Sequence, residues 1–428
     1  MSPEHELYTL YLDYTQETES PRNYHRWVLT SLIGTIIGRN CYVPFGPWKI
    51  YPNQYILLVG PPGVRKGSAI SIGKKLLREI DYPYFGPDRA AKEAIWYEMA
   101  KMAGQLNGFD SKSMKDEDIF ALDVEDEIKE SIAHMYICTD EFTAFTGYGN
   151  EEFMINLTNL WDNLPVFSNP KLTSSSVTVY NPTFNILSGS TQENIADAFP
   201  KSVIGSGFTA RTLLIHGSRG KKIPWPPTPN QDTKHKILDY LIKIENHKGA
   251  VEATKEAREL LEMVYHKAMP IADRRFEHFF QRRQTHLLKQ CLVNAISRDD
   301  EKITVPDVML ANTALYIAER EMPLALGHFG KSLSSSKANT VLEAIYHSPA
   351  PLDFRSLWKQ VAQDCAKEME LKEILRNLVA AEKIQSATVK TKIGKTSKVY
   401  LPKRSSETSE WQRSLINYDL VSEEEKIH

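Results

Sequence analysis

The stretch from Tyr55 to Ile70, YILLVGPPGVRKGSAI, constrains the fold of this chain more than any other segment. It begins with a short apolar run that predicts a buried strand, because Gly-Pro-Pro stops the run at once. The segment that follows, SAISIGKKLLREI, has the pattern of a helix whose exposed face bears Lys74, Lys75 and Arg78. Strand, glycine-rich turn and helix in this order are the context that a phosphate-binding loop requires.

The loop itself departs from the expected spelling G-x-x-x-x-G-K-[ST] at two positions. Gly60 and Lys66 stand at the right separation, but Arg65 replaces the second glycine and Gly67 replaces the Ser or Thr. Ser68, one residue later, is a candidate to replace the missing hydroxyl as a Mg²⁺ ligand, directly or through water. An ordinary Gly/Pro turn before a helix is the alternative interpretation.

A working loop of this kind binds phosphate with its backbone N–H groups, the positive end of the helix and one lysine. Glycines free the backbone for the turn, and the lysine reaches the phosphates from the first turn of the helix. The predicted nucleotide-binding residues of the loop are Gly60, Pro61, Pro62, Gly63, Val64, Arg65, Lys66, Gly67 and Ser68.

A second apolar strand, within MYICTDEF, ends in two carboxylates, Asp140 and Glu141. This is the Walker B pattern, in which Asp140 would hold the Mg²⁺ and its water shell. Glu141 would orient and polarise the attacking water. Phosphoryl transfer depends on positioning and charge neutralisation, so the two motifs together predict ATP and Mg²⁺ as ligands. A strand that happens to end in an acidic turn is the alternative.

Two later segments supply further candidates for this chemistry. The strand FNILSGSTQ ends in Ser190, Thr191 and Gln192, one of which would sense the γ-phosphate or the water, and the spacing does not decide which. In GSGFTARTLLIHG, Arg211 precedes the last apolar strand. An arginine at this place can project into a neighbouring subunit's site, which would require an oligomer. A surface arginine is the alternative for Arg211.

Apolar strands that alternate with helices predict an α/β fold with a parallel sheet covered on both faces. The Gly/Pro-rich stretch from 217 to 232 marks a boundary, and a helical pattern follows it. The predicted organisation is a helical N-terminal segment (1–50), a P-loop ATPase core (51–217), a helical lid (218–330), a winged-helix-like domain (336–404) and an acidic tail (405–428).

With these residues in place, the chain resembles P-loop ATPases of the AAA+ and RecA-like helicase kind, and most nearly a helicase-like family of phages and mobile elements. The resemblance covers roughly residues 20–325. It rests on GPPGVRKGSA, YFGPD with AKEA after it, CTDEFTAF, NPTFNILSGSTQENI and GSGFTARTLLI. It implies an ATPase that works as an oligomer, the hexameric ring of such motors, with ATP and Mg²⁺ bound between subunits.

The segment RRQTHLLKQCLVNAISRDDEKITVPDVMLANTALYIAERE resembles the lid of AAA+ replicative helicases. By this similarity Arg283, or Arg282 beside it, is the candidate second sensor of the nucleotide. Arginines that merely solvate a helix face are the alternative. Thr304 and Asp307 have the spacing of a helix cap, which predicts the start of the last lid helix.

Residues 336–404 predict three short helices followed by a basic β-hairpin, the outline of a winged helix. The lysines of this hairpin can neutralise nucleic-acid phosphates, and the helix before the hairpin could enter a groove of DNA. Winged helices also dock proteins, which is the alternative. The predicted DNA-binding residues are Lys372, Arg376, Lys390, Lys392, Lys395 and Lys398.

No apolar run approaches the roughly 20 residues that cross a bilayer, so no membrane partner is expected. Four widely spaced cysteines without a C-x-x-C pair favour a reducing cytoplasm. The leading hypothesis is an ATP-driven oligomeric DNA helicase or translocase in phage or mobile-element replication, with other replication proteins as partners. The alternatives are an ATP-switched assembly factor, such as a helicase loader or a transposition or origin regulator, and a P-loop protein without a nucleic-acid partner.

Overall fold

The structure is a computed structural model, and its contacts divide the chain into two compact units after Gly327. Unit 1 runs to Gly327, unit 2 follows it, and each unit is described by itself. The described residues are 5–88, 92–105, 128–169, 177–200, 207–218, 222–271, 273–327, 333–346, 348, 350–363, 365, 367–381, 383–390 and 396–402. The predicted acidic tail (405–428) lies outside them.

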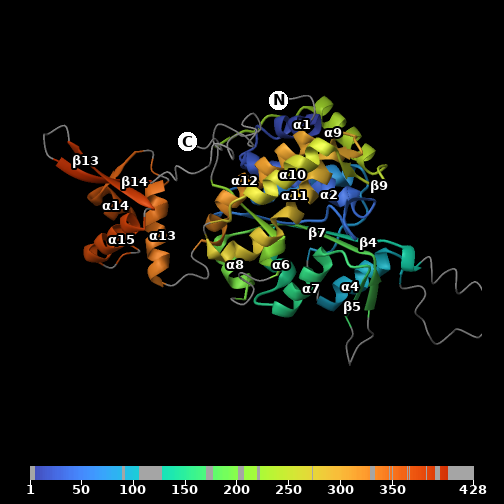
Figure 1. Ribbon diagram of the computed structural model, residues 1–428, viewed down its shortest axis with the longest axis horizontal. Helices are drawn as coiled ribbons and strands as arrows, with labels where there is room; N and C mark the ends of the chain where they lie inside the picture. Colours follow the sequence, from blue (N-terminus) through green and yellow to red (C-terminus); the bar gives the residue numbers. More distant parts are fainter. Residues whose placement is uncertain are drawn as a thin grey trace, which may run out of the picture. The chain divides into compact units, whose positions relative to one another are not determined.

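The first part of unit 1 contains the segments that surround the predicted loop (Figure 1). In chain order they are α1 (Glu6–Tyr14), α2 (Arg22–Ile37), β1 (Cys41–Phe45), β2 (Trp48–Ile50), β3 (Tyr55–Val59), α3 (Lys66–Glu79), α4 (Lys92–Met102), β4 (Ala133–Thr139), α6 (Phe142–Thr146), α7 (Glu151–Trp161), β5 (Val166–Asn169), β6 (Val177–Tyr180), β7 (Pro182–Ser190), α8 (Gln192–Ala198), the 3₁₀ helix η3 (Thr209–Arg211) and β8 (Thr212–His216).

The second part of unit 1 is mostly helical, as the sequence predicts. It contains α9 (Gln231–Ile244), β9 (Gly249–Ala250), β10 (Glu252–Ala253), α10 (Lys255–Lys267), the 3₁₀ helix η4 (Arg274–Phe276), α11 (Glu277–Ser297), β11 (Lys302–Ile303) and α12 (Val305–Leu326).

The centre of unit 1 is a four-stranded, all-parallel sheet in the order β4-β7-β3-β8. These are the four apolar strands that the sequence predicts, and residues 182–190 of β7 are buried throughout. The segment around Phe85 adds one parallel bridge beside β4, at Tyr136. The chain is therefore an α/β protein. Among the residues that the structure describes, no helix is long and apolar enough to cross a membrane.

Helices cover both faces of the sheet, as continuous apolar strands require. The register aligns Tyr55 of β3 with Ile186 of β7 and Ile137 of β4, so Tyr136 points to the opposite face from Tyr55. The Tyr136 hydroxyl lies 3.0 Å from that of Ser31 in α2, whereas the Tyr55 hydroxyl donates to the carbonyl of Leu157 in α7. Helix α2 and helix α7 thus lie on opposite faces.

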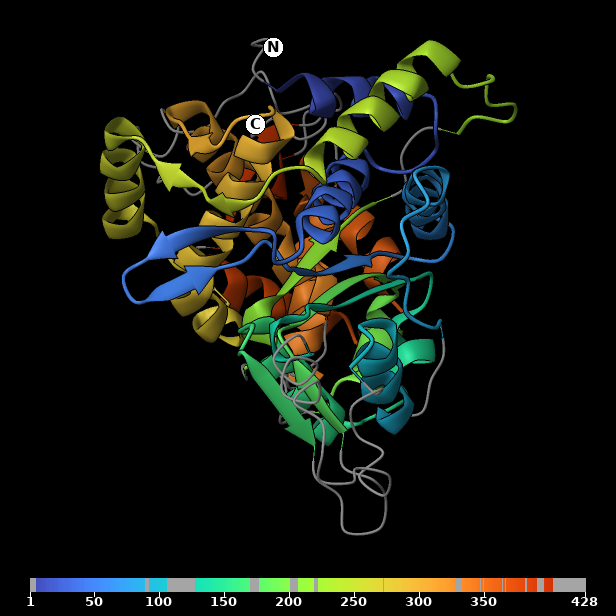
Figure 2. The same ribbon diagram turned by 90° about the vertical axis from the view of Figure 1, so that its right-hand side faces the viewer.

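The predicted N-terminal segment (1–50) is helical in α1 and α2, but residues 41–45 and 48–50 form strands. Strands β1 and β2 form an antiparallel hairpin, with Phe45 opposite Trp48, and β9 pairs in parallel with β1. In Figure 2 this hairpin, in blue, projects from the body of the unit. Pro44 and Pro47 hide the strand signal, because prolines are usually excluded from strand interiors.

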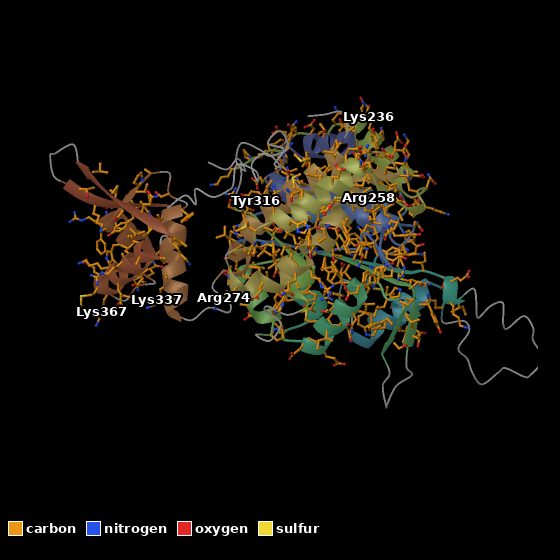
Figure 3. The ribbon with its side chains drawn as sticks, viewed as in Figure 1. Lys236, Arg258, Arg274, Tyr316, Lys337 and Lys367 are labelled. Carbon is orange, nitrogen blue, oxygen red and sulfur yellow. The ribbon has the colours of Figure 1, made fainter. Side chains whose placement is uncertain are left out.

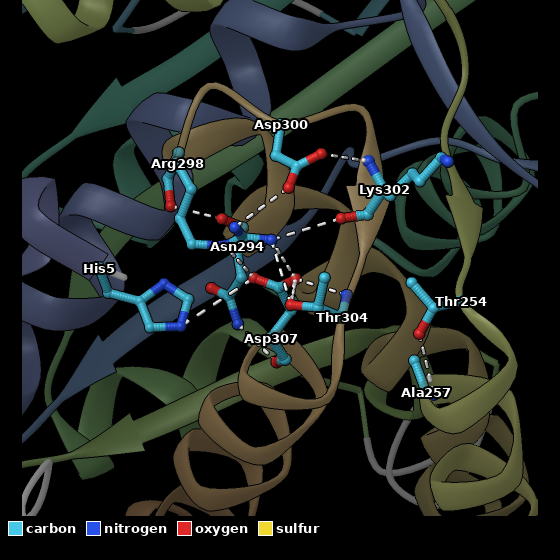
Figure 4. Close-up of polar contacts among 10 residues, drawn as sticks. His5, Thr254, Ala257, Asn294, Arg298, Asp300, Lys302, Thr304 and Asp307 are labelled. Atoms are coloured by element: carbon cyan, nitrogen blue, oxygen red, sulfur yellow. Dashed lines mark hydrogen bonds and ion pairs between the residues drawn. The ribbon is translucent and has the colours of Figure 1, made fainter. Parts of the chain in front are cut away.

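The start of α12 is fixed by the predicted cap. The Asp307 carboxylate accepts the backbone N–H of Thr304 at 2.7 Å and the guanidinium of Arg298 at 2.7 Å, and it is fully buried (Figure 4). Asn294 of α11 donates to the Asp307 carbonyl at 3.0 Å. This network joins the last two helices of unit 1 at one end, so the Thr304–Asp307 cap is confirmed.

Unit 2 contains the three predicted helices and the predicted hairpin, together with one strand that the sequence did not suggest. Its three-stranded sheet has the order β12-β14-β13. Buried apolar residues such as Leu357 and Leu371 fill the space between helices and sheet. The elements are α13 (Leu333–Tyr346), β12 (Leu352–Asp353), α14 (Phe354–Val361), α15 (Glu368–Ala380), β13 (Ile384–Lys390) and β14 (Thr396–Pro402).

Three buried histidines make the stability of unit 1 sensitive to mild acid. Burial lowers the pKa of His25 and of His286 to about 3, and that of His134 to about 4. The unfolded chain takes up these protons near pH 6.5, whereas the folded chain does not, so stability is complete above pH 6.5 and falls as the pH falls. We expect a loss of about 1.4 kcal/mol per pH unit for each histidine between pH 6 and 4.

Urea denaturation followed at several pH values measures this slope. His134→Asn removes one of the three histidines. The slope of the unfolding free energy against pH should therefore decrease by about the contribution of one histidine. An unchanged slope would mean that His134 is protonated in the folded chain.

Candidate functional site

The predicted loop, residues 60–65, joins the carboxyl end of β3 to the first residue of α3. Gly63 adopts a φ of 83°, which favours glycine. Arg65 has φ 63° and ψ 33°, in the left-handed region, where a side chain costs roughly 1 kcal/mol. The loop therefore keeps at Arg65 the backbone conformation that the expected glycine would adopt easily. The replacement of the expected glycine by Arg65 changes the side chain at this position and leaves the turn in place.

Lys66 curls back over the loop from the first turn of α3. Its Nζ donates to the carbonyls of Gly60 at 2.7 Å and Pro61 at 3.1 Å. Partial burial lowers the pKa of Lys66, and the charges of Glu141 and Glu193 oppose that shift. The ammonium thus lies inside the loop, within the influence of the carboxylate that follows β4.

The end of β4 comes close to the first turn of α3. A Cβ on Gly67 would lie 3.2 Å from the carboxyl carbon of Asp140. A Cβ on Gly189 of β7 would lie 2.5 Å from the Asp140 carbonyl oxygen and 3.4 Å from Cβ of Lys66. Because β7 lies between β3 and β4, this glycine lets the loop and the carboxylates meet across it. The loop and the carboxylates that follow β4 lie far apart in the chain but form one site.

We expect Gly189→Ala to disrupt this meeting point while leaving the fold intact. The added methyl group would collide with the Asp140 carbonyl oxygen, so the end of β4 must move. If the site turns over a nucleotide, the rate should fall at least about tenfold, because sub-ångström displacement at a reacting centre is costly. Turnover measured beside circular dichroism tests this. A normal rate in a folded variant would place the chemistry elsewhere.

The two carboxylates differ in environment. Asp140 is exposed, and its pKa is raised by partial burial, an effect that the Lys74 ammonium opposes. Glu141 is half-buried and accepts a hydrogen bond from the Thr143 hydroxyl at 3.1 Å. This bond holds Glu141 at the start of α6, where a carboxylate can orient a water molecule.

The three polar residues at the end of β7 have different surroundings. The Ser190 hydroxyl is fully buried, and no hydrogen-bond partner contacts it among the described residues. The Thr191 hydroxyl caps α8 by accepting the N–H of Asn194 at 3.1 Å. Gln192 donates to the carbonyl of Leu324 in α12 at 2.5 Å. Of the three, Ser190 is therefore the one whose side chain forms no hydrogen bond among the described residues.

Mg²⁺ prefers oxygen ligands and commonly uses one or two carboxylates together with substrate phosphates. Asp140 fits such a site because it faces the loop and is exposed. Among the described residues no cluster of three or more potential metal ligands occurs, so the phosphates and water would complete the shell. Gly67 is the position of α3 whose Cβ would face Asp140, and adjacent residues of a helix point about 100° apart. The role of Ser68 as a Mg²⁺ ligand, directly or through water, stays a prediction.

Arg211 does not present a free guanidinium to a neighbouring subunit. Its side chain is 7% exposed, and its Nη2 lies 2.6 Å from Oδ2 of Asp162 at the end of α7. Nε donates to the other carboxylate oxygen, and Nη1 donates to the carbonyl of Gly207. The guanidinium also lies 5.6 Å from the ring of Trp161. In this structure Arg211 is bound within its own subunit, and its action on a neighbouring subunit's site stays a prediction.

Arg283 is likewise internal. Its side chain is 7% exposed and lies 2.7 Å from the Glu319 carboxylate of α12, and it donates to Asn312 at 2.9 Å. All its described partners are in α12, so it links α11 to α12. Arg282, the alternative, is more exposed and lies 3.7 Å from Asp162. In this structure Arg283 is bound to Glu319 and Asn312, and its role as a nucleotide sensor stays a prediction.

The predicted DNA-binding residues of unit 2 are in part exposed. Lys372 and Arg376 lie one turn apart on α15, and Lys398 lies on β14. Glu368 and Glu373 are exposed on the same helix, so α15 is not uniformly basic. Figure 3 labels Lys337, which pairs with Glu370 at 2.6 Å, and Lys367, which precedes α15. Lys392, Lys395 and the side chain of Lys390 lie outside the described residues.

Two features of the site had no signal in the sequence. Lys74, expected on the exposed face of its helix, donates to the carbonyl of Cys138 at 2.9 Å and to Asp88 at 3.0 Å. It thus connects α3 to β4, the strand that Asp140 follows. Glu19, from the connection between α1 and α2, contacts Arg65 of the loop. Both contacts join segments far apart in the chain, which spacing alone does not disclose.

The comparisons with known proteins assign no relative. No protein-family model matches the chain, and a search of curated proteins finds no match. Any statement of function therefore depends on the geometry of the site.

Proposed function

We propose that the chain is an ATPase, and specifically an ATP-dependent oligomeric DNA helicase or translocase of the phage or mobile-element kind that its sequence resembles. The observation that carries the proposal is the meeting of Lys66, Asp140 and Gly189 at the carboxyl end of a parallel sheet. Ligands of α/β proteins bind at this edge. Glu141 beside them completes the set of groups that ATP hydrolysis uses.

In this proposal the chain's own residues bind and orient the nucleotide. The backbone N–H groups of the loop and the Lys66 ammonium hold the phosphates. Glu141 orients the attacking water and accepts its proton. Asp140 would hold Mg²⁺, which when bound neutralises phosphate charge. The buried Ser190 hydroxyl, with no described partner, is the candidate contact to the γ-phosphate or the water.

The nucleic-acid part of the proposal comes from unit 2. The order of three helices and a three-stranded sheet with a β13–β14 hairpin resembles that of a winged helix, which supports a nucleic-acid interface in unit 2. Exposed Lys372, Arg376 and Lys398 supply positive charge to DNA phosphates. The β5–β6 hairpin of unit 1 is a candidate pore element, and its tip lies outside the described residues.

A second candidate function is an ATP-switched assembly factor, which binds DNA without unwinding it. Two observations favour slow hydrolysis. Gly67 offers no hydroxyl beside Asp140, and Arg211 is paired within its own subunit. Such a protein would change partners when ATP binds and would reset on slow hydrolysis.

The deciding experiment measures ATP hydrolysis by the full chain with no DNA, with single-stranded DNA and with a forked duplex, at two salt concentrations. Stimulation by DNA together with strand separation supports the motor. DNA binding without strand separation supports the switch. Hydrolysis that no DNA affects at either salt concentration would remove DNA from the proposal.

A further inference from the structure

Arg65 stands where a glycine is expected, and its side chain contacts a residue of another segment. Its Nε lies 2.5 Å from Oε2 of Glu19. The Ser20 hydroxyl donates to the Arg65 carbonyl at 2.9 Å. Two consecutive residues of the α1–α2 connection therefore hold the residue that has the strained backbone.

Glu19 also reaches a third segment. Its other carboxylate oxygen accepts the backbone N–H of Ile223 at 3.0 Å, in the connection that follows β8. One carboxylate thus joins the loop, the N-terminal helices and the segment that leads to α9. A change at Arg65 would be transmitted to both of the other segments.

The pair lies next to a site that must accept a polyanion. Arg65 immediately precedes Lys66, and the side chains of Arg65 and Glu19 are 53% and 25% exposed. Partly exposed ion pairs are weak because water screens them. Arginine binds phosphate strongly, with two parallel hydrogen bonds. An arriving phosphate group would attract the guanidinium and repel the carboxylate.

We propose that Glu19 and Arg65 form an exchangeable ion pair that responds to the nucleotide. In one state Glu19 holds Arg65, through the contact that the structure describes. When a nucleoside di- or triphosphate binds, Arg65 leaves Glu19 and binds a phosphate oxygen. This contact adds a second side-chain cation at a loop that has no hydroxyl at position 67. The exchange removes the side-chain link between the loop and Glu19, while the Ser20 hydroxyl still donates to the Arg65 carbonyl and Glu19 still accepts the N–H of Ile223. The inference rests on the proposed nucleotide site.

The alternative is a fixed brace, in which the pair only holds the loop in shape. The two possibilities predict opposite signs for one measurement. If Arg65 moves to the phosphate, loss of Glu19 frees Arg65 and removes a repelling charge, so the nucleotide binds more tightly. If the pair is a brace, loss of either partner damages the loop in the same way.

The test is the dissociation constant for the fluorescent nucleotide mant-ADP, measured for the full chain. Arg65→Asn keeps a residue that tolerates the left-handed backbone. It should weaken binding about tenfold, as loss of a charged hydrogen bond does. Glu19→Gln should tighten binding about threefold, the size of a screened charge effect. The double variant should resemble Arg65→Asn, because Glu19 acts through Arg65.

Several outcomes overturn the inference. Similar weakening in both single variants shows a brace, and an unchanged Arg65→Asn variant shows that the guanidinium does not contact phosphate. Melting temperatures without nucleotide verify that each variant is folded. Lys66→Ala distinguishes a failure of the nucleotide site from a failure of the exchange. If the wild-type chain binds no mant-ADP, or binds it equally well without Lys66, the nucleotide site is wrong. If binding depends on Lys66 but not on Arg65, only the exchange is wrong.

Discussion

Lys66→Ala is expected to reduce ATP turnover by about 10²–10³-fold, the usual cost of removing a preorganised charged donor. The Lys66 ammonium lies within the loop, hydrogen-bonded to the carbonyls of Gly60 and Pro61, where no other described lysine is bonded. Those carbonyls are weaker partners than a phosphate, so the lysine can exchange them for the nucleotide. Without the lysine, only the backbone N–H groups and Arg65 would stabilise the phosphate charge in the loop.

The matched control is Lys75→Ala, a lysine on the exposed side of the same helix. It removes the same charge and the same number of atoms from α3, so its turnover should stay within about twofold of wild type, since exposed substitutions usually have small effects. Steady-state phosphate release at saturating ATP gives both rates. Equal rates for the two variants would mean that the loop does not hold the nucleotide.

The strands and the loop were predictable because their signals are local. Each strand of the sheet is a continuous apolar run, and the turn after Val59 is marked by glycine and proline. The Thr304–Asp307 cap was predictable for the same reason, since its parts are three residues apart. Local signals therefore identified the strand that leads into the loop, the carboxylates and the start of α12.

The roles of the arginines were not predictable, because a side chain's partner can lie far along the chain. Arg211 is bound by Asp162, 49 residues away, and Arg65 by Glu19, 46 residues away. A pattern that places an arginine before a strand does not show whether it points to solvent or to an internal carboxylate. The packing of α7 against the sheet decides this for Arg211, and that packing appears only in three dimensions.

Glu319→Ala is expected to destabilise unit 1 by about 3–5 kcal/mol, as breaking a buried pair by removing one partner usually does. The Glu319 carboxylate lies 2.7 Å from Nε of Arg283, although the N–H is not aligned for a hydrogen bond. Burial raises the pKa of Glu319 more than the Arg283 charge lowers it. The pair is therefore not strongly stabilising by itself, and most of the loss comes from Arg283 left charged and buried.

The double variant Arg283→Met with Glu319→Leu tests this account, because it removes both charges and keeps apolar volume between α11 and α12. It should recover stability to within about 1 kcal/mol of wild type in urea denaturation. A single variant that loses less than about 1 kcal/mol would show that Arg283 finds another partner. ATP turnover by the folded double variant then decides the remaining role of Arg283. A structural residue allows near-normal turnover, whereas a nucleotide sensor that swings out of the lid on binding would lose it, because methionine cannot contact phosphate.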